Sequence, residues 1–225
     1  MPHRPVIAGN WKMHHGPGAT RRFFEELAPR LDAAGEDGSP RVMIFPPALS
    51  FAAARESLGE GTPVELGVQN IHWEPSGAYT GELSASMAAE AGATLVLVGH
   101  SERRHVFGET DDEVARKVSS AVEQDLVPVI CVGETLDQRK EDRVEEVITG
   151  QLEAALESLL DAAEAGEGGA AGGSLPELMV AYEPVWAIGT GETATPADAS
   201  EAHETLRALL ASLRGADLAE SVPIL

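Results

Sequence analysis

Cysteine and long apolar runs are scarce in this sequence. A single cysteine, Cys131, excludes an internal disulfide and a metal site built from several cysteines, and it agrees with a reducing compartment. No stretch approaches the roughly 18 consecutive apolar residues that a membrane span requires. The apolar run near the N-terminus is too short for the core of a signal peptide. We therefore expect a soluble, cytoplasmic protein.

Positive charge is also scarce. The 225 residues carry 37 acidic and 16 basic side chains, a formal net charge of −21. Such an excess repels nucleic acid phosphates and anionic lipid surfaces, so neither is an expected partner. The acidity itself is typical of a solvated surface. Only three lysines occur, Lys12, Lys117 and Lys140, so a lysine at the end of an apolar strand stands out.

The sequence has no Gly-x-Gly-x-x-Gly after its first apolar run and no Gly-Lys-Ser/Thr phosphate loop, which weakens the nucleotide-binding open-sheet folds. It does have seven short apolar runs separated by helical stretches. Near-continuous apolar runs are typical of parallel strands covered on both faces, so we predict an α/β fold. The runs are Val6 to Ala8, Val42 to Phe45, Val64 to Val68, Leu95 to Val98, Val127 to Val132, Leu178 to Tyr182 and Val222 to Leu225.

The segments between the runs carry helix signals. Acidic residues from Asp111 open one helix, and a Thr195 cap followed by proline opens another that runs to Arg214. The stretch from Glu141 to Glu164 is rich in Glu, Ala and Leu and predicts a long helix. The glycine-rich segment 165–174 is interpreted as a flexible surface insertion. We therefore expect one domain over 1–225, although periodicity leaves open whether its sheet is a barrel or open.

Polar residues at the ends of three strands are the candidates for chemistry. Taken alone, Lys12 is typical of a surface ion pair, His100 of a structural histidine, and Glu183 of a helix cap or salt bridge. In a parallel α/β barrel, however, catalytic groups come from the carboxyl ends of strands, so these three would converge on one cleft. A cation, a neutral hydrogen-bond donor and a base together suit proton abstraction next to a carbonyl.

Six motifs in this chain resemble those of the triosephosphate isomerase family, in the family's order. The longest is highly specific, and the match runs along the whole chain. The motifs are Asn10-Trp11-Lys12, Gln69-Asn70, Gly77 to Glu82, Gly99 to Arg104, Cys131 to Glu134, and Ala181 to Gly191.

The resemblance implies a (β/α) barrel that interconverts dihydroxyacetone phosphate and D-glyceraldehyde 3-phosphate without a metal or cofactor. Glu183 would be the base, and His100 would be the neutral electrophile that polarises the carbonyl. Lys12, held partly by Asn10, would supply positive charge to the anionic substrate and to the developing enediolate.

The resemblance also implies supporting roles. Pro184 to Gly191 would form a lid whose Gly189 offers a backbone N–H to the phosphate. Glu102 would be a second carboxylate near the catalytic lysine, and Cys131 would be a buried packing residue. Thr80 would lie on the loop that reaches into a partner subunit, which implies a homodimer.

The chain departs from the family after the sixth helix. It reaches Leu225 near the start of the seventh strand, whereas the family continues through an eighth strand and the phosphate-binding loops after strands seven and eight. We therefore expect an incomplete barrel of about seven parallel strands, a homo-oligomer that differs from the family dimer where open edges are covered, and strongly impaired turnover. The alternative is a catalytically inactive truncated barrel. Another phosphate-handling barrel is disfavoured by the lid and histidine motifs.

Overall fold

The computed structural model describes residues 4–31, 40–59, 61–165 and 175–225. The chain divides into two compact units, and each is taken by itself below. The first unit runs to Leu97 and includes Ser120–Val127, and the second consists of Val98–Ser119 and Pro128–Leu225. Nearly all of the glycine-rich segment at 165–174 lies outside the described residues. The expectation of one domain stays a prediction.

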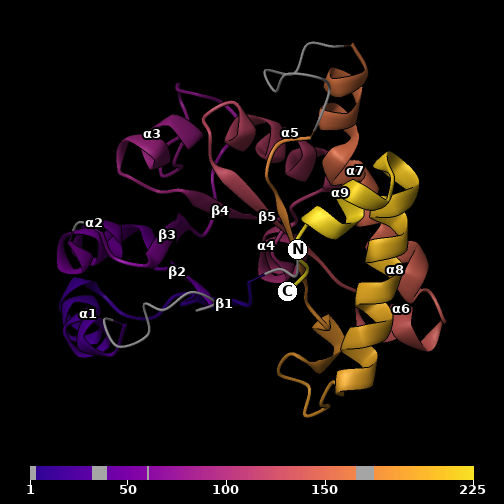
Figure 1. Cartoon of the computed structure of the whole chain (residues 1–225), viewed down its shortest axis with the longest axis horizontal. Helices are drawn as coiled ribbons and strands as arrows, with labels where there is room; N and C mark the ends of the chain where they lie inside the picture. The colour runs from indigo at the N-terminus through magenta and orange to yellow at the C-terminus, as the bar shows by residue number, and fades with distance from the viewer. Residues whose placement is uncertain (1–3, 32–39, 60, 166–174) are drawn as a thin grey trace. The chain divides into compact units, whose positions relative to one another are not determined.

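Strands and helices alternate along the chain, as the sequence predicts (Figure 1). The strands are β1 (Val6–Asn10), β2 (Arg41–Phe45), β3 (Val64–Val68), β4 (Leu95–Val98), β5 (Val127–Val132) and β6 (Met179–Tyr182). The helices are α1 (Pro17–Leu31), α2 (Ala48–Leu58), α3 (Ala85–Glu90), α4 (Ser101–Phe107), α5 (Asp111–Val122), α6 (Leu136–Lys140), α7 (Val144–Ala165), α8 (Pro196–Arg214) and α9 (Ala216–Ser221), with a 3-10 turn at Val185–Ala187.

In the first unit β1, β2, β3 and β4 pair in parallel in chain order. Their core is fully buried at Met43, Phe45 and Leu95. Gly67 on β3 is required by the Phe45 ring, because a Cβ at this position would lie 2.2 Å from a ring carbon. Helices α1 and α2 contact each other on the outside of these strands (Figure 1).

Strand β1 is less covered than its apolar sequence predicts. Ile7 is 58% exposed, and Ala8 is exposed as well, whereas β3 and β4 are almost entirely buried. The expectation that all strands are covered on both faces is therefore wrong for β1. The physical reason is its place at the end of the strand order, where it hydrogen-bonds to β2 along one edge.

In the second unit β5 and β6 pair in parallel, with Cys131 opposite Ala181. The last apolar run continues this pairing next to β6: Ile224 forms a parallel bridge with Val180, and the Tyr182 amide donates to the Leu225 carbonyl over 2.9 Å. It is shorter than the strand we expected there. The parallel strand and helix alternation is that of an incomplete α/β barrel, as predicted.

The helix starts follow their sequence signals. Thr195 caps α8 with a reciprocal pair of bonds to Asp198, and α5 begins at Asp111. The predicted long helix is α7, which begins after the short α6. In the described ranges no helix is long and apolar enough to cross a membrane.

Candidate active site

His100 and Glu183 meet in the second unit. His100 follows β4 as the cap of α4, and Glu183 follows β6 directly. The two side chains are 7% and 18% exposed, and His100 Nε2 lies 2.8 Å from Glu183 Oε1. The Ser101 backbone amide donates to Glu183 Oε2 over 2.8 Å. Two of the three predicted catalytic groups are therefore in direct contact.

The hydrogen bonds of His100 define a neutral imidazole. Its Nδ1 accepts from the backbone amide of Glu102 over 3.2 Å, so Nδ1 carries no proton. The ring proton is then on Nε2, where it is donated to the Glu183 carboxylate. A neutral ring with Nε2–H is a hydrogen-bond donor that can polarise a carbonyl oxygen.

The Glu183 carboxyl group is held in its ionised form. Burial by itself raises the pKa of this group, but the hydrogen bond from His100 and the bonds from Ser101 together lower the pKa below its ordinary value. At neutral pH the carboxylate can therefore accept a proton.

Gly133 sets the position of the Glu183 backbone. The Glu183 amide donates to the Val132 carbonyl over 2.8 Å, which extends the β5–β6 pairing. A Cβ on Gly133 would lie 1.9 Å from the Glu183 carbonyl oxygen. Gln151 on α7 holds the other side of Gly133, accepting from its amide over 2.8 Å. Only glycine allows this close approach.

Lys12 and Asn10 lie together in the first unit, just past β1. Lys12 has the left-handed backbone angle φ 49, which costs a non-glycine residue roughly 1–2 kcal/mol. Its amide donates to Asn10 Oδ1 over 2.9 Å. Gln69, after β3, donates from Nε2 to Asn10 Oδ1, to the Lys12 carbonyl and to the Phe45 carbonyl over 3.2, 2.8 and 2.9 Å. The sequence pointed to Asn10 as the support of Lys12, but the role of Gln69 was missed.

Two further predicted residues border His100 and Glu183. The Glu102 carboxylate lies 3.8 Å from His100 Nδ1, and its proximity to Lys12 stays a prediction. Cys131 on β5 is buried, and burial raises the pKa of its thiol well above the ordinary value, with a further contribution from Glu183. A protonated, buried thiol is a packing group and a poor nucleophile.

The predicted lid begins with the 3-10 turn Val185–Ala187. Trp186 is buried in this turn, and its carbonyl accepts from the Thr190 hydroxyl over 2.6 Å. Gly189 and Gly191 follow with positive φ angles of 72 and 87, a backbone shape that favours glycine. Both are exposed. The segment thus has one anchored end and a glycine-rich tip.

Thr80 is exposed on the loop between β3 and α3 in the first unit. The base of this loop is closed by a bridge between His72 and Ser84. Within the loop the His72 ring packs against the rings of Trp73 and Tyr79, and the distance between ring centroids is 4.1 Å in each pair. These contacts fix the shape of the loop that carries Thr80.

A buried network beside the lid was not anticipated. Glu134 is 0% exposed, and its Oε1 accepts from the Tyr182 hydroxyl over 3.0 Å and from Arg139 Nη1 over 3.2 Å. Burial, and then the Glu134 carboxylate, raise the pKa of the Tyr182 phenol, which therefore stays a donor. The signal was present, because Tyr182 and Glu134 belong to two of the recognised motifs.

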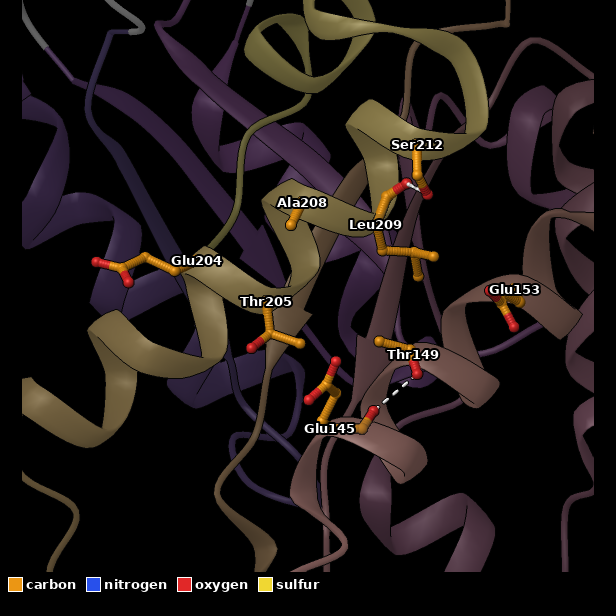
Figure 2. A pocket seen from close by; sticks show the side chains of 8 residues that line it. All are labelled: Glu145, Thr149, Glu153, Glu204, Thr205, Ala208, Leu209 and Ser212. Atoms are coloured by element: carbon orange, nitrogen blue, oxygen red, sulfur yellow. Dashed lines mark hydrogen bonds between the residues drawn. The ribbon is translucent and has the colours of Figure 1, made fainter.

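A surface hollow of about 550 Å³ lies between α7 and α8 (Figure 2). It contains none of the predicted site residues, so the chemistry is not located there. Glu145, Thr149 and Glu153 line it from α7, and Glu204, Thr205, Ala208, Leu209 and Ser212 line it from α8. Within the described part of the chain, no group of three or more His, Cys, Asp or Glu side chains is arranged to hold a metal ion.

Parallel strands alternating with helices, and a glutamate in contact with a histidine after two strand ends, are typical of an α/β-barrel enzyme. A family model described as "Triosephosphate isomerase" matches residues 5–225. Proteins named triosephosphate isomerase from Roseiflexus sp. (strain RS-1), Caldanaerobacter subterraneus and Rubrobacter xylanophilus are 42%, 43% and 44% identical to this chain. The matches cover 98–99% of this chain and 81–83% of those proteins.

The chain belongs to the triosephosphate isomerase family. Its identification as an isomerase, predicted from the motifs, is confirmed. The roles of the individual residues are taken up as proposals below.

Proposed function

We propose that this protein interconverts dihydroxyacetone phosphate and D-glyceraldehyde 3-phosphate, with Glu183 as the base and His100 as the neutral electrophile. The observation that carries the proposal is the contact between His100 Nε2 and the Glu183 carboxylate, at 2.8 Å, in a site where the pKa of Glu183 is lowered. A base must be unprotonated before it meets the substrate, and an electrophile must hold a proton to donate.

In the proposed reaction Glu183 removes a proton from the carbon next to the substrate carbonyl. The electrons of the broken C–H bond form the carbon–carbon double bond of an enediolate, and His100 Nε2–H bonds to the oxygen where negative charge develops. Glu183 then returns the proton to the neighbouring carbon, while the hydroxyl proton on the first carbon moves to the former carbonyl oxygen, so that the carbonyl group now lies on the first carbon. Lys12 stabilises the added negative charge, which a chain of net charge −21 would otherwise oppose.

The lid segment has a direct connection to the base. Pro184 follows Glu183 in the chain, so movement of the lid displaces the base as well. In the structure the carboxylate is bonded to Ser101 and His100, and it must leave Ser101 to reach a substrate carbon. Closure would bring the Gly189 amide to the substrate phosphate and exclude water from the enediolate.

A coupled isomerase assay tests this proposal. Glu183→Gln keeps the shape of the side chain and removes the base, and we expect turnover to fall about 10²–10⁴-fold. Glu192→Gln, at an exposed position just past the lid, is the matched control and should leave turnover unchanged. If wild-type turnover is no higher than that of Glu183→Gln, the alternative of a catalytically inactive barrel holds. The same assay measures whether turnover of the 225 residues is impaired, which stays a prediction.

A second copy of this chain is the proposed partner. Three exposed apolar side chains follow neighbouring strands of the first unit at the same ends: Met13 after β1, Leu49 after β2 and Tyr79 after β3, at 94%, 88% and 43% exposure. Thr80 lies beside the last of these. Large exposed apolar side chains after neighbouring strands of one sheet are the kind of surface that a partner chain can cover.

Light scattering after size-exclusion chromatography tests the assembly. We expect the wild type to elute as a homodimer and Met13→Glu to shift it to a monomer, because a carboxylate would be buried without a partner. Gln124→Glu adds the same charge at an exposed position of the same unit and should leave the mass unchanged. A monomeric wild type would contradict the proposal.

A further inference from the structure

Arg139, near the end of α6, contacts one residue at the start of the lid, Pro184 to Gly191, and one residue beyond its end. Its guanidinium carbon lies 4.4 Å from the ring centroid of Trp186, the buried residue of the first hinge. Its Nη2 forms an ion pair with Asp198, which lies in the first turn of α8 just after the lid. One planar cation therefore contacts the residues before and after the glycine-rich tip.

The arginine is itself anchored on a rigid part of the fold. Its Nη1 donates to Glu134 Oε1 over 3.2 Å, and that carboxylate is 0% exposed at the end of β5. Tyr182 on β6 donates to the same oxygen over 3.0 Å. The Arg139 side chain is 29% exposed, so solvent screens these ion pairs less than it screens fully exposed ones. Its five N–H donors lie in one plane, so one face can stack on a ring while the edges bind two carboxylates.

Two polar atoms of this network, Glu134 Oε2 and Trp186 Nε1, lack a hydrogen-bond partner among the described residues. Glu134 Oε2 is buried and has no partner among the residues that the structure describes. A buried carboxylate oxygen without a partner is rare, because its desolvation is not offset. This arrangement of the hinge therefore does not satisfy every buried group around Arg139.

We propose that Arg139 is a positioning residue for the lid, holding Trp186 and the start of α8 in register so that the segment between them moves as one piece. The inference rests on the proposed function only in treating 184–191 as the lid of the isomerase site. Without the guanidinium, Trp186 loses its stacking partner and Asp198 loses its cation. The lid then spends less time closed, and we expect kcat to fall about tenfold with a smaller change in KM.

Fluorine NMR provides a readout that does not depend on turnover. The chain has three tryptophans, Trp11, Trp73 and Trp186, so 5-fluorotryptophan labelling gives three signals, and Trp186→Phe assigns one of them. We expect Arg139→Gln to shift and broaden the Trp186 signal and to leave the other two unchanged. Arg139→Lys keeps the charge but not the planar stack, so it should restore kcat in part while the Trp186 signal stays shifted.

Two further variants complete the test: a control at another arginine, and a substitution of an Arg139 partner. Arg143 lies between α6 and α7 and pairs with exposed Glu141 and Glu146, so Arg143→Gln should change neither the signals nor kcat. If Arg139→Gln fails to fold, Asp198→Asn removes the cation's partner at one end while an amide oxygen can still cap α8. It should broaden the Trp186 signal as well.

The outcomes distinguish the positioning role of Arg139 from the proposed isomerase activity. A Trp186 signal in Arg139→Gln that matches Arg143→Gln overturns the inference, and so does a change that spreads equally to the other two tryptophans. Glu183→Gln should lower turnover about 10²–10⁴-fold and leave the Trp186 signal in place. If the wild type proves inactive, the proposed function fails, but the fluorine signals still decide whether Arg139 holds the hinge.

Discussion

Replacing Gln69 with leucine should lower both stability and activity, because this amide holds the backbone of Lys12. The Gln69 Nε2 group donates to three oxygens, and the Phe45 carbonyl among them also accepts from the Trp11 amide. Leucine therefore removes two N–H donors and leaves the Lys12 carbonyl without this bond. At about 1 kcal/mol for each donor, the free energy of unfolding should fall by about 2 kcal/mol.

The loss of activity follows from the backbone of Lys12. Its left-handed conformation costs roughly 1–2 kcal/mol, and Gln69 and Asn10 offset that cost. With Gln69 gone, the segment relaxes and the ammonium group is displaced. Because 1.4 kcal/mol corresponds to a tenfold change, kcat/KM should fall about 10-fold to 30-fold.

Denaturant unfolding and the coupled isomerase assay measure the two effects. Gln124→Leu is the control, since the Gln124 side chain is exposed and donates to the adjacent Glu123 carbonyl. Gln69→Glu has the same shape but places a carboxylate against carbonyl oxygens. At neutral pH it should lower the free energy of unfolding and kcat/KM more than Gln69→Leu does. Wild-type kcat/KM in Gln69→Leu would refute the link between Gln69 and Lys12.

The remaining predictions concern the second unit. His100→Ala should raise the pKa of Glu183, since burial remains while the imidazole bond is lost, and the acid limb of the kcat/KM profile should move to higher pH; an unmoved limb contradicts this. In the wild type the lowered pKa contributes stability above the pKa of an unfolded glutamate, and this stability is lost as pH falls through the folded value, measurable by unfolding against pH. Gly133→Ala should lower the free energy of unfolding by about 3 kcal/mol or more, while Gly150→Ala, in open space on α7, should raise it by roughly 0.5–1 kcal/mol. Lys117→Met leaves the buried Glu109 carboxylate with Arg103 as its remaining cation, and the free energy of unfolding should fall by about 1–3 kcal/mol.

Local signals in the sequence predicted the elements well. The apolar runs became β3, β4 and β5 with the expected bounds, and the Thr195 cap opens α8. These features depend on residues close together in the chain. The motif from Ala181 to Gly191 likewise placed Glu183 at a strand end, where it meets His100.

Contacts between distant residues could not be predicted in the same way. Gln69 is 57 residues from Lys12, and Arg139 is 59 residues from Asp198, so neither pair has a spacing that marks it. A glutamine and an arginine are also ordinary surface residues by type. The exposure of Ile7 was missed because an apolar strand has the same sequence pattern at the end of the strand order as in its interior.

Because the chain has only three lysines, a lysine-specific reagent can report on the proposed site. Lys117 is buried against Glu109, so it should resist acylating reagents in the folded protein. Of the other two, Lys12 is the one proposed to meet an anionic substrate, and Lys140 is exposed on α6. A bound anionic substrate should slow the acylation of Lys12. Brief acylation followed by mass spectrometry measures this protection, with the acylation of Lys140 as the reference within the same molecule.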